Sequence, residues 1–173
     1  MYFSLTKLFI PLILLIASTL NASPRSQQTD DSLIHRIILS GYINDFANVM
    51  GRHSAELEPL LLELEEKTGA QIVLVTLPSL EGGDIGDFTV QLFERWGIGQ
   101  QSEDNGVLLL TSIEDRQIRI EVGYGLEPII TDSTAGRILD EIVIPLFQQE
   151  EYGMGLTAGV ASVATIIAAE GGI

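Results

Sequence analysis

Residues 96–127 read WGIGQQSEDNGVLLLTSIEDRQIRIEVGYGLE, and this stretch decides the fold. Within it, residues 107–111 (VLLLT) form a continuous apolar run, which is typical of a strand buried on both faces. Gln117–Val122 (QIRIEV) alternates polar and apolar residues, which predicts a strand with one face toward water. A short polar segment at 112–116 joins the two runs. We therefore expect them to pair as a hairpin within a sheet.

The flanking regions supply further strands and helices. Residues 70–77 (AQIVLVTL) are rich in β-branched residues and predict another buried strand. Apolar residues at helical spacing predict helices at 53–67, 84–96, 133–147 and 156–169. Helices that alternate with strands, together with a hairpin, predict an α/β fold. Its expected form is a three-layer α/β/α sandwich around a central mixed sheet of about four strands.

Several boundaries follow from local signals. Asp84 is the expected N-cap of the second helix. Pro59 favours a start of the first helix near residues 56–58, because proline is tolerated in the first turn of a helix. Residues 41–47 are interpreted as a loop that enters the domain, and the glycines at 152–155 as a break before the last helix.

The N-terminus has the pattern of a secretory signal peptide. Lys7 precedes an apolar core at residues 8–16, and small residues follow, with cleavage expected after Ala22. Residues 1–22 are thus a predicted signal peptide, residues 23–40 a linker, and residues 41–170 the folded domain. The first part of the linker is polar and interpreted as flexible, and for its apolar part, residues 33–39, a short packed helix or a lead strand stays open. The expected location is the periplasm or the outside of the cell. An uncleaved segment that anchors the protein to the membrane is the open alternative.

The amino-acid composition excludes several kinds of binding and catalytic site. The formal net charge is −15, from 9 basic and 24 acidic residues, which argues against nucleic-acid binding through a basic patch. The sequence contains no cysteine, so disulfides, thiolate catalysis and thiolate zinc sites are excluded. Only two histidines occur, which disfavours a multi-histidine metal site. The acidic charge is better explained by cations or basic partners as ligands, or by a role in solubility alone.

Acidic and amide side chains lie beside the glycine turns. Asp104 and Asn105 precede the first strand of the hairpin, Glu127 follows the second, and Asp45 lies in the entry loop. Calcium takes about six to eight oxygen ligands from carboxylates, amides and carbonyls. We therefore consider Asp45, Asp104, Asn105 and Glu127 candidate metal ligands. Because Asp and Asn before Gly also serve turn geometry, that second interpretation stays open.

Two other side chains of the hairpin region are ambiguous. Arg119 is expected on the wetter face of its strand, where it either pairs with Glu121 or holds an anionic ligand. Tyr124 stands between two glycines and either presents its ring at a site or packs with its hydroxyl hydrogen-bonded. Ion pairing is the commoner explanation for the arginine.

The order of the motifs resembles the TPM-domain family, also called the TPM phosphatase family. The resemblance covers roughly residues 41–169 and rests on WGIG, DNGVLLL, DR-x-x-RI-x-VGYGLE and P-x-F-x-x-x-x-Y-x-x-G-L. In that family, acidic residues at positions matching Asp45, Asp104 and Glu127 are associated with calcium. Some members are described as acid phosphatases. Members in thylakoids assist repair of photosystem II, and others act with membrane protein partners.

The resemblance and the residues together suggest two functions. The favoured one is a secreted or periplasmic accessory or interaction module that binds calcium through its loop carboxylates. Its partner would be a protein of the cell envelope, such as a membrane complex. The alternative is a metal-dependent acid phosphatase that uses the same acidic cluster. No P-loop pattern supports phosphate binding, and no catalytic residue is assigned.

Overall fold

The central sheet is mixed and has four strands. The computed structural model describes residues 32–172, so the expected signal peptide and the first part of the linker lie outside the described residues. The strands β1 (Ile43–Asp45), β2 (Gln71–Leu77), β3 (Gly106–Ser112) and β4 (Gln117–Val122) follow the order β1-β2-β3-β4. The first three run parallel, and β4 is antiparallel to β3. The predicted hairpin and mixed sheet are confirmed.

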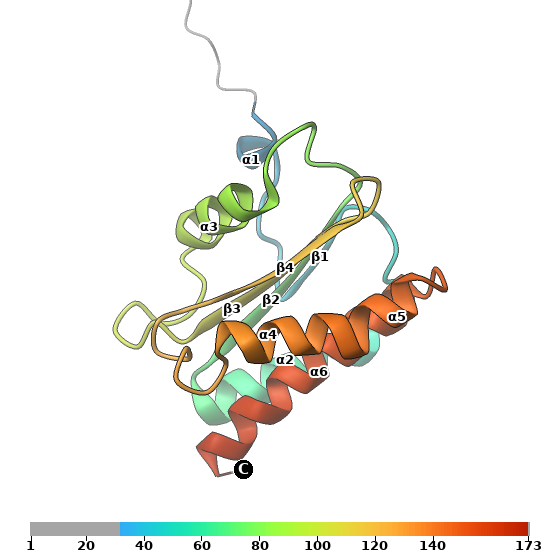
Figure 1. Ribbon diagram of the computed structural model, residues 1–173. Helices are drawn as coiled ribbons and strands as arrows, with labels where there is room; N and C mark the ends of the chain where they lie inside the picture. The colour runs from blue at the N-terminus through green and yellow to red at the C-terminus, as the bar shows by residue number, and fades with distance from the viewer. Residues whose placement is uncertain (1–31, 173) are drawn as a thin grey trace, which may run out of the picture. The chain divides into compact units, whose positions relative to one another are not determined.

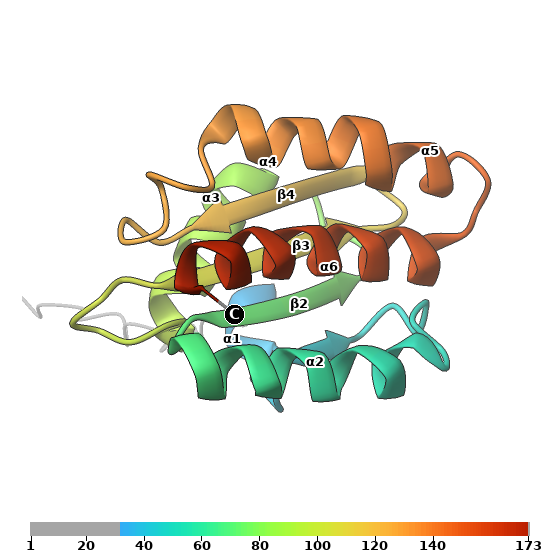
Figure 2. The same ribbon diagram turned by 90° about the horizontal axis from the view of Figure 1, so that it is seen from below.

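Helices cover both faces of the sheet. On one face lie α2 (His53–Thr68), α4 (Asp132–Ile138), α5 (Ile144–Phe147) and α6 (Tyr152–Gly171) (Figure 1, Figure 2). On the other lie α1 (Leu33–Arg36) and α3 (Ile85–Trp96) (Figure 1). Successive strand residues point to opposite faces, so Leu74 joins the core beneath α2 and α6, and Val75 joins the core beneath α3. The predicted three-layer sandwich is confirmed.

The fold begins earlier than the interpretation of 41–47 as a loop implied. Residues 43–45 form β1, a three-residue edge strand that pairs with β2. Before it, α1 and the following residues pack on the α3 side of the sheet, where Ile37 is buried and Leu33 and Leu39 contact the same core. The apolar part of the expected linker is therefore part of the folded region.

The helix α2 starts at His53, three residues before the earliest start that Pro59 suggested. Pro59 lies inside the helix and removes one backbone hydrogen bond. Burial compensates for that loss, because Leu57, Leu61 and Leu64 are all buried against the sheet. Leu60, whose spacing from Leu57 and Leu64 places it on the same side of the helix, lies at the margin of the core and is 39% exposed. The helix ends at Gly69, which adopts the left-handed conformation at φ 75°.

The predicted helix at 133–147 is interrupted by a π-helical turn. The segment η1 (Leu139–Val143) separates α4 from α5, and the Ile144 N–H donates to the carbonyl of Leu139, five residues back. Pro145 follows directly and has no N–H to continue a regular ladder. Widening the helix by one residue just before the proline accommodates its ring.

The helix α6 starts at Tyr152, so the interpretation of 152–155 as a chain break is wrong. Its glycines serve close packing. A Cβ on Gly153 would lie 2.9 Å from the carbonyl oxygen of Val49, and one on Gly159 would lie 2.6 Å from Cγ2 of Val143. Among the described residues, α6 alone is long and apolar enough to cross a bilayer, yet it packs extensively against α2 and the core. A helix of a protein core has the same composition.

These contacts predict opposite effects for two glycine-to-alanine changes in helices. Gly153→Ala forces a methyl group against a backbone carbonyl and is expected to destabilise the protein by about 1–3 kcal/mol. Gly136→Ala in α4 is the matched control, because no atom lies within 4 Å of its Cβ position. It should stabilise by about 0.5–1 kcal/mol. Urea unfolding of both variants measures the difference, and equal midpoints for Gly153→Ala and the parent chain would contradict this packing.

Candidate functional site

The acidic loops at one end of the sheet lie together. Asp104 and Asn105 precede β3, and the glycine turn at 123–125 follows β4. Because β4 is antiparallel to β3, the start of one strand meets the end of the other. The Gly123 N–H donates to the carbonyl of Gly106 at 2.8 Å, and the Gly125 N–H donates to the carbonyl of Asp104 at 3.0 Å. The predicted juxtaposition of these two loops is therefore present.

The two loops touch backbone to backbone, which only glycine permits. A Cβ on Gly123 would lie 2.1 Å from the carbonyl oxygen of Asp104. One on Gly125 would lie 1.9 Å from that of Glu103. The opposing backbone leaves no room for a side chain at either position. The two glycines therefore hold the loops in one arrangement.

Asn105 has a structural role in this arrangement. Its side-chain oxygen accepts from the Gln100 N–H at 2.8 Å, and its amide nitrogen donates to the carbonyl of Gly69 at 3.0 Å. The side chain thus ties the end of α2 to the loop before β3. Both polar atoms of this predicted metal ligand are engaged in holding the backbone.

The carboxylates of Asp104 and Glu127 remain exposed. Glu103 beside Asp104 is exposed as well, and the described residues offer none of the three a side-chain hydrogen bond or ion pair. Tyr124 at the tip of the glycine turn is 77% exposed. We call Glu103, Asp104, Tyr124 and Glu127 the acidic loop surface. It presents an aromatic ring beside carboxylates on a rigid backbone.

Asp45 lies at the opposite end of the sheet. It ends β1 and pairs in register with Thr76 near the end of β2. Its carboxylate accepts from the Thr76 hydroxyl at 2.5 Å and from the N–H groups of Val49 and Met50 at 3.0 and 2.9 Å. The structure therefore does not bring Asp45 together with Asp104 and Glu127. Its carboxylate holds the turn that leads into α2.

Within residues 32–172, no three His, Cys, Asp or Glu side chains are grouped so that they could hold a metal ion. Calcium needs about six to eight oxygens. Asp104 and Glu127 supply carboxylate oxygens of the right chemical type, so the other ligands of a calcium ion there would have to be carbonyl oxygens or water.

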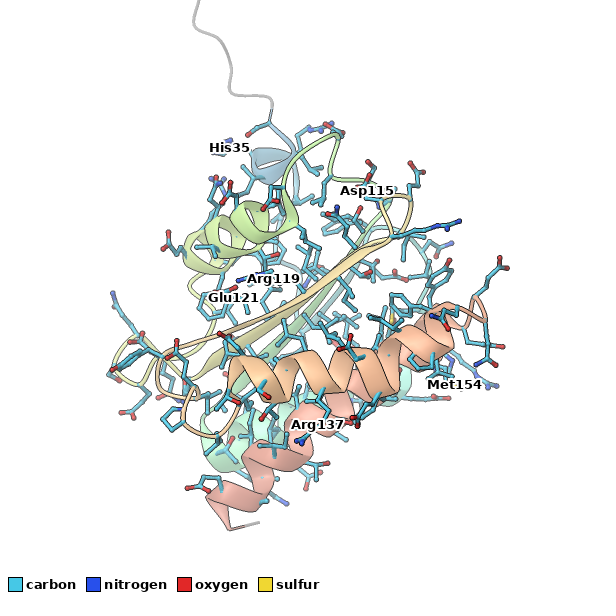
Figure 3. The ribbon with its side chains drawn as sticks, in the orientation of Figure 1. His35, Asp115, Arg119, Glu121, Arg137 and Met154 are labelled. Atoms are coloured by element: carbon cyan, nitrogen blue, oxygen red, sulfur yellow. The ribbon has the colours of Figure 1, made fainter. Side chains whose placement is uncertain are left out.

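Arg119 forms an ion pair with Glu121, as expected for the wetter face of β4. Its Nε and Nη2 atoms donate to one oxygen of Glu121 at 2.9 and 2.8 Å. Both side chains extend from β4 toward the α3 side of the sheet (Figure 3). The guanidinium of Arg119 therefore pairs with a residue of its own strand.

Sequence reasoning missed Asp115, which organises the β3–β4 hairpin (Figure 3). Its carboxylate accepts from the Ser112 hydroxyl at 2.5 Å and from the Leu80 N–H at 2.6 Å. These two hydrogen bonds, led by the one from Ser112, hold the pKa of Asp115 below its usual range. The available signal was an Asp in a short turn, a residue that often bonds nearby backbone. Its partner on the β2–α3 loop could not be seen in the sequence.

The domain matches one known family. The TPM domain family matches residues 43–166. The N-terminal domain of a protein from P. gingivalis is 30% identical, with a TM-score of 0.70 over 75% of this chain and 83% of that one. No curated protein matches the chain.

Two further solved structures share the fold at lower identity. The N-terminal domain of a Corynebacterium glutamicum protein is 18% identical, with a TM-score of 0.58 over 74% of this chain and 80% of that one. A protein from the psychrophilic bacterium Bizionia argentinensis is 18% identical, with a TM-score of 0.60 over 70% of this chain and 82% of that one.

The contrast between Asp45 and Asp104 leads to a stability prediction. Asp45→Ala leaves two N–H groups and the buried Thr76 hydroxyl without their acceptor, so we expect a loss of about 1–3 kcal/mol. Asp104→Ala removes an exposed side chain and should change stability by less than about 0.5 kcal/mol. Chemical unfolding of both variants tests this. Equal losses would mean that the two aspartates have similar structural roles.

Proposed function

The chain belongs to the TPM-domain family, and we propose that it is an interaction module of the cell envelope that binds a protein partner through the acidic loop surface. The observation that carries this proposal is the exposure of Tyr124, 77%, on a loop whose glycines are packed against another backbone. An exposed aromatic ring on a rigid support loses little conformational entropy when it binds.

The charge of this surface indicates the kind of partner. Glu103 and Asp104 belong to the loop that packs on the glycine turn of Tyr124, and Glu127 follows that turn, within a chain of net charge −15. A complementary partner surface carries lysine or arginine around a pocket that receives the tyrosine ring. Tyr is enriched among the residues that dominate binding energy at protein interfaces. Complementary charge would raise the association rate.

The location in the cell envelope rests on the sequence of the N-terminus. The expected signal peptide at residues 1–22 is the basis for a secreted or periplasmic address, and those residues lie outside the described part of the chain. Retention of this segment would anchor the same domain at the outer side of the membrane. Either arrangement gives the acidic loop surface access to envelope proteins.

Calcium is a proposed modulator of this surface. It would bind the exposed carboxylates of Asp104 and Glu127 together with loop carbonyls, and reduce their mutual repulsion. Because the described donors are few, we expect an affinity at the weak end for proteins, with Kd on the order of 10⁻⁴–10⁻³ M. The acid phosphatase alternative would use the same carboxylates, and no feature of the described residues favours it.

Calcium binding predicts a selective rise in melting temperature of the full chain. A ligand that binds only the native state adds about 2.7 kcal/mol of stability at a concentration 100-fold above Kd. We expect calcium to raise the melting temperature more than magnesium does, and Asp104→Ala combined with Glu127→Ala to abolish the rise. Asp45→Asn is the control that should retain it. A full calcium response in the double variant would place the ion elsewhere.

The partner-binding surface can be tested by site-specific cross-linking. A photoreactive phenylalanine analogue at position 124 should give a discrete cross-linked species in cells of the native host. The same analogue at Phe46, which is 41% exposed at the other end of the sheet, is the matched control. Equal cross-linking at both positions, or none at 124, would refute the proposed surface. Hydrolysis of a chromogenic phosphate monoester that Asp104→Ala and Glu127→Ala abolish would instead favour the phosphatase.

A further inference from the structure

A pocket lies at the other end of the sheet, between the β3–β4 hairpin and the turn that joins α5 to α6. Its volume is about 410 Å³, and its walls come from residues 111–118 and 144–152. Ligand-binding pockets typically have volumes of about 300–1,000 Å³. Because β3 ends and β4 begins here, the pocket is remote from the acidic loop surface and independent of it.

One side of the pocket is apolar. Ile118 of β4 and Ile144 and Phe147 of α5 line it, and all three side chains are half-buried. Phe147 also forms an edge-to-face pair with Tyr152 of α6, with ring centroids 5.1 Å apart and an interplanar angle of 72°. This pair fixes an aromatic wall against which an apolar side chain of a ligand can pack.

The other side carries two opposite charges that do not meet. Arg116 in the hairpin and Glu150 in the α5–α6 turn both line the pocket. Their charged atoms are more than 4.0 Å apart, and neither forms an ion pair with any residue in the described part of the chain. Arg36, Arg52, Lys67 and Arg119 each pair with a carboxylate, whereas Arg95 and Arg137, like Arg116, form no ion pair within residues 32–172. In a chain with 24 acidic and 9 basic residues, an arginine in a pocket without an acidic partner is available for a ligand.

Both charged residues of the pocket have left-handed backbone conformations. Arg116 has φ 53° and Glu150 has φ 63°, a region that residues other than glycine seldom occupy. The hydroxyls of Thr111 and Ser112 at the end of β3 are already bonded, to the Gln117 carbonyl and to Asp115. Ligand contacts are therefore left to side chains at the rim.

We propose that this pocket binds a small zwitterion with an apolar side chain, namely an apolar amino acid or dipeptide. The ligand carboxylate would accept two hydrogen bonds from the planar guanidinium of Arg116. Its ammonium group would face the carboxylate of Glu150, and its side chain would lie against Ile118 and Phe147. The Tyr152 hydroxyl, which bonds no other described residue, supplies a further polar contact.

The charge balance of the pocket selects against a phosphate group. A dianion would meet one guanidinium but also the carboxylate of Glu150, and Glu114 and Asp115 lie in the same hairpin as Arg116. A carboxylate carries one negative charge, and the ammonium group of a zwitterion turns Glu150 into an attractive partner. The separation of the two charges thus favours a ligand that carries both.

The proposal is tested by NMR titration of the ¹⁵N-labelled full chain with L-leucine and leucyl-leucine. We expect saturable chemical-shift changes of backbone amides, confined to residues 111–118 and 144–152. Arg116→Gln should weaken binding roughly ten- to hundredfold, because it removes a charged hydrogen-bond donor. Arg95→Gln on α3 is the matched control, since Arg95 is exposed and lies outside the pocket. The Arg95→Gln variant should bind both ligands with the affinity of the parent chain.

Ligand analogues assign each charge separately. Leucinamide lacks the carboxylate and should bind the parent chain and Arg116→Gln equally weakly. N-acetyl-leucine lacks the ammonium group and should be insensitive to Glu150→Gln. Absence of saturable shifts with either zwitterion would overturn the proposal, as would binding that Arg116→Gln leaves unchanged. Shifts caused by inorganic phosphate but not by leucine would show an anion site of a different kind.

Discussion

Both faces of β2 and β3 must be kept from water, and this requirement organises the whole domain. The two strands pair along seven registered positions, which satisfies their backbone groups. Their side chains then point to two faces, with Leu109 in one core and Leu108 and Leu110 in the other. Helices are needed on each side, and the resulting layers leave the two ends of the sheet as the places where loops can carry exposed polar chemistry.

Glycine solves two different packing problems in this structure. At the end of the sheet near β4, Gly123 and Gly125 let one loop lie directly on the carbonyls of another. In α6, Gly153 and Gly159 let a helix approach the turn before α2 and the side chain of Val143. Neither use depends on flexibility. In both, the missing side chain lets a neighbouring segment lie closer to the glycine backbone and makes the arrangement more specific.

Sequence periodicity was sufficient where an element is long enough to show it. The alternation in β4, the apolar run of β3 and the N-cap Asp84 of α3 all appear as predicted. The strand β1 has only three residues, which are too few to show a period, and the prediction of a loop there is wrong. The π-helical turn depends on Pro145 and on tertiary packing, which a helical pattern does not record.

The arrangement of the candidate site residues was likewise predictable only in part from the sequence. The sequence indicated that Asp104 and Glu127 belong to neighbouring loops, because they flank the two strands of one hairpin. The position of Asp45 depended on the direction of β1, which the residues did not reveal. Asn105 was predicted as a ligand, whereas its amide bonds Gly69, a residue 36 positions earlier. The pocket joins two segments far apart in the chain, so its lining emerges only in three dimensions.

The π-helical turn between α4 and α5 determines which side chains of α5 face the hairpin. One extra residue in a turn rotates everything that follows by about 100° relative to a regular helix. Here that rotation directs Ile144 and Phe147 toward the pocket after Ile138 and Val143 have joined the core. An otherwise identical relative without the extra residue would present a different face of α5 to the hairpin. The length of this segment can therefore change what the pocket admits while the sheet and its cores stay the same.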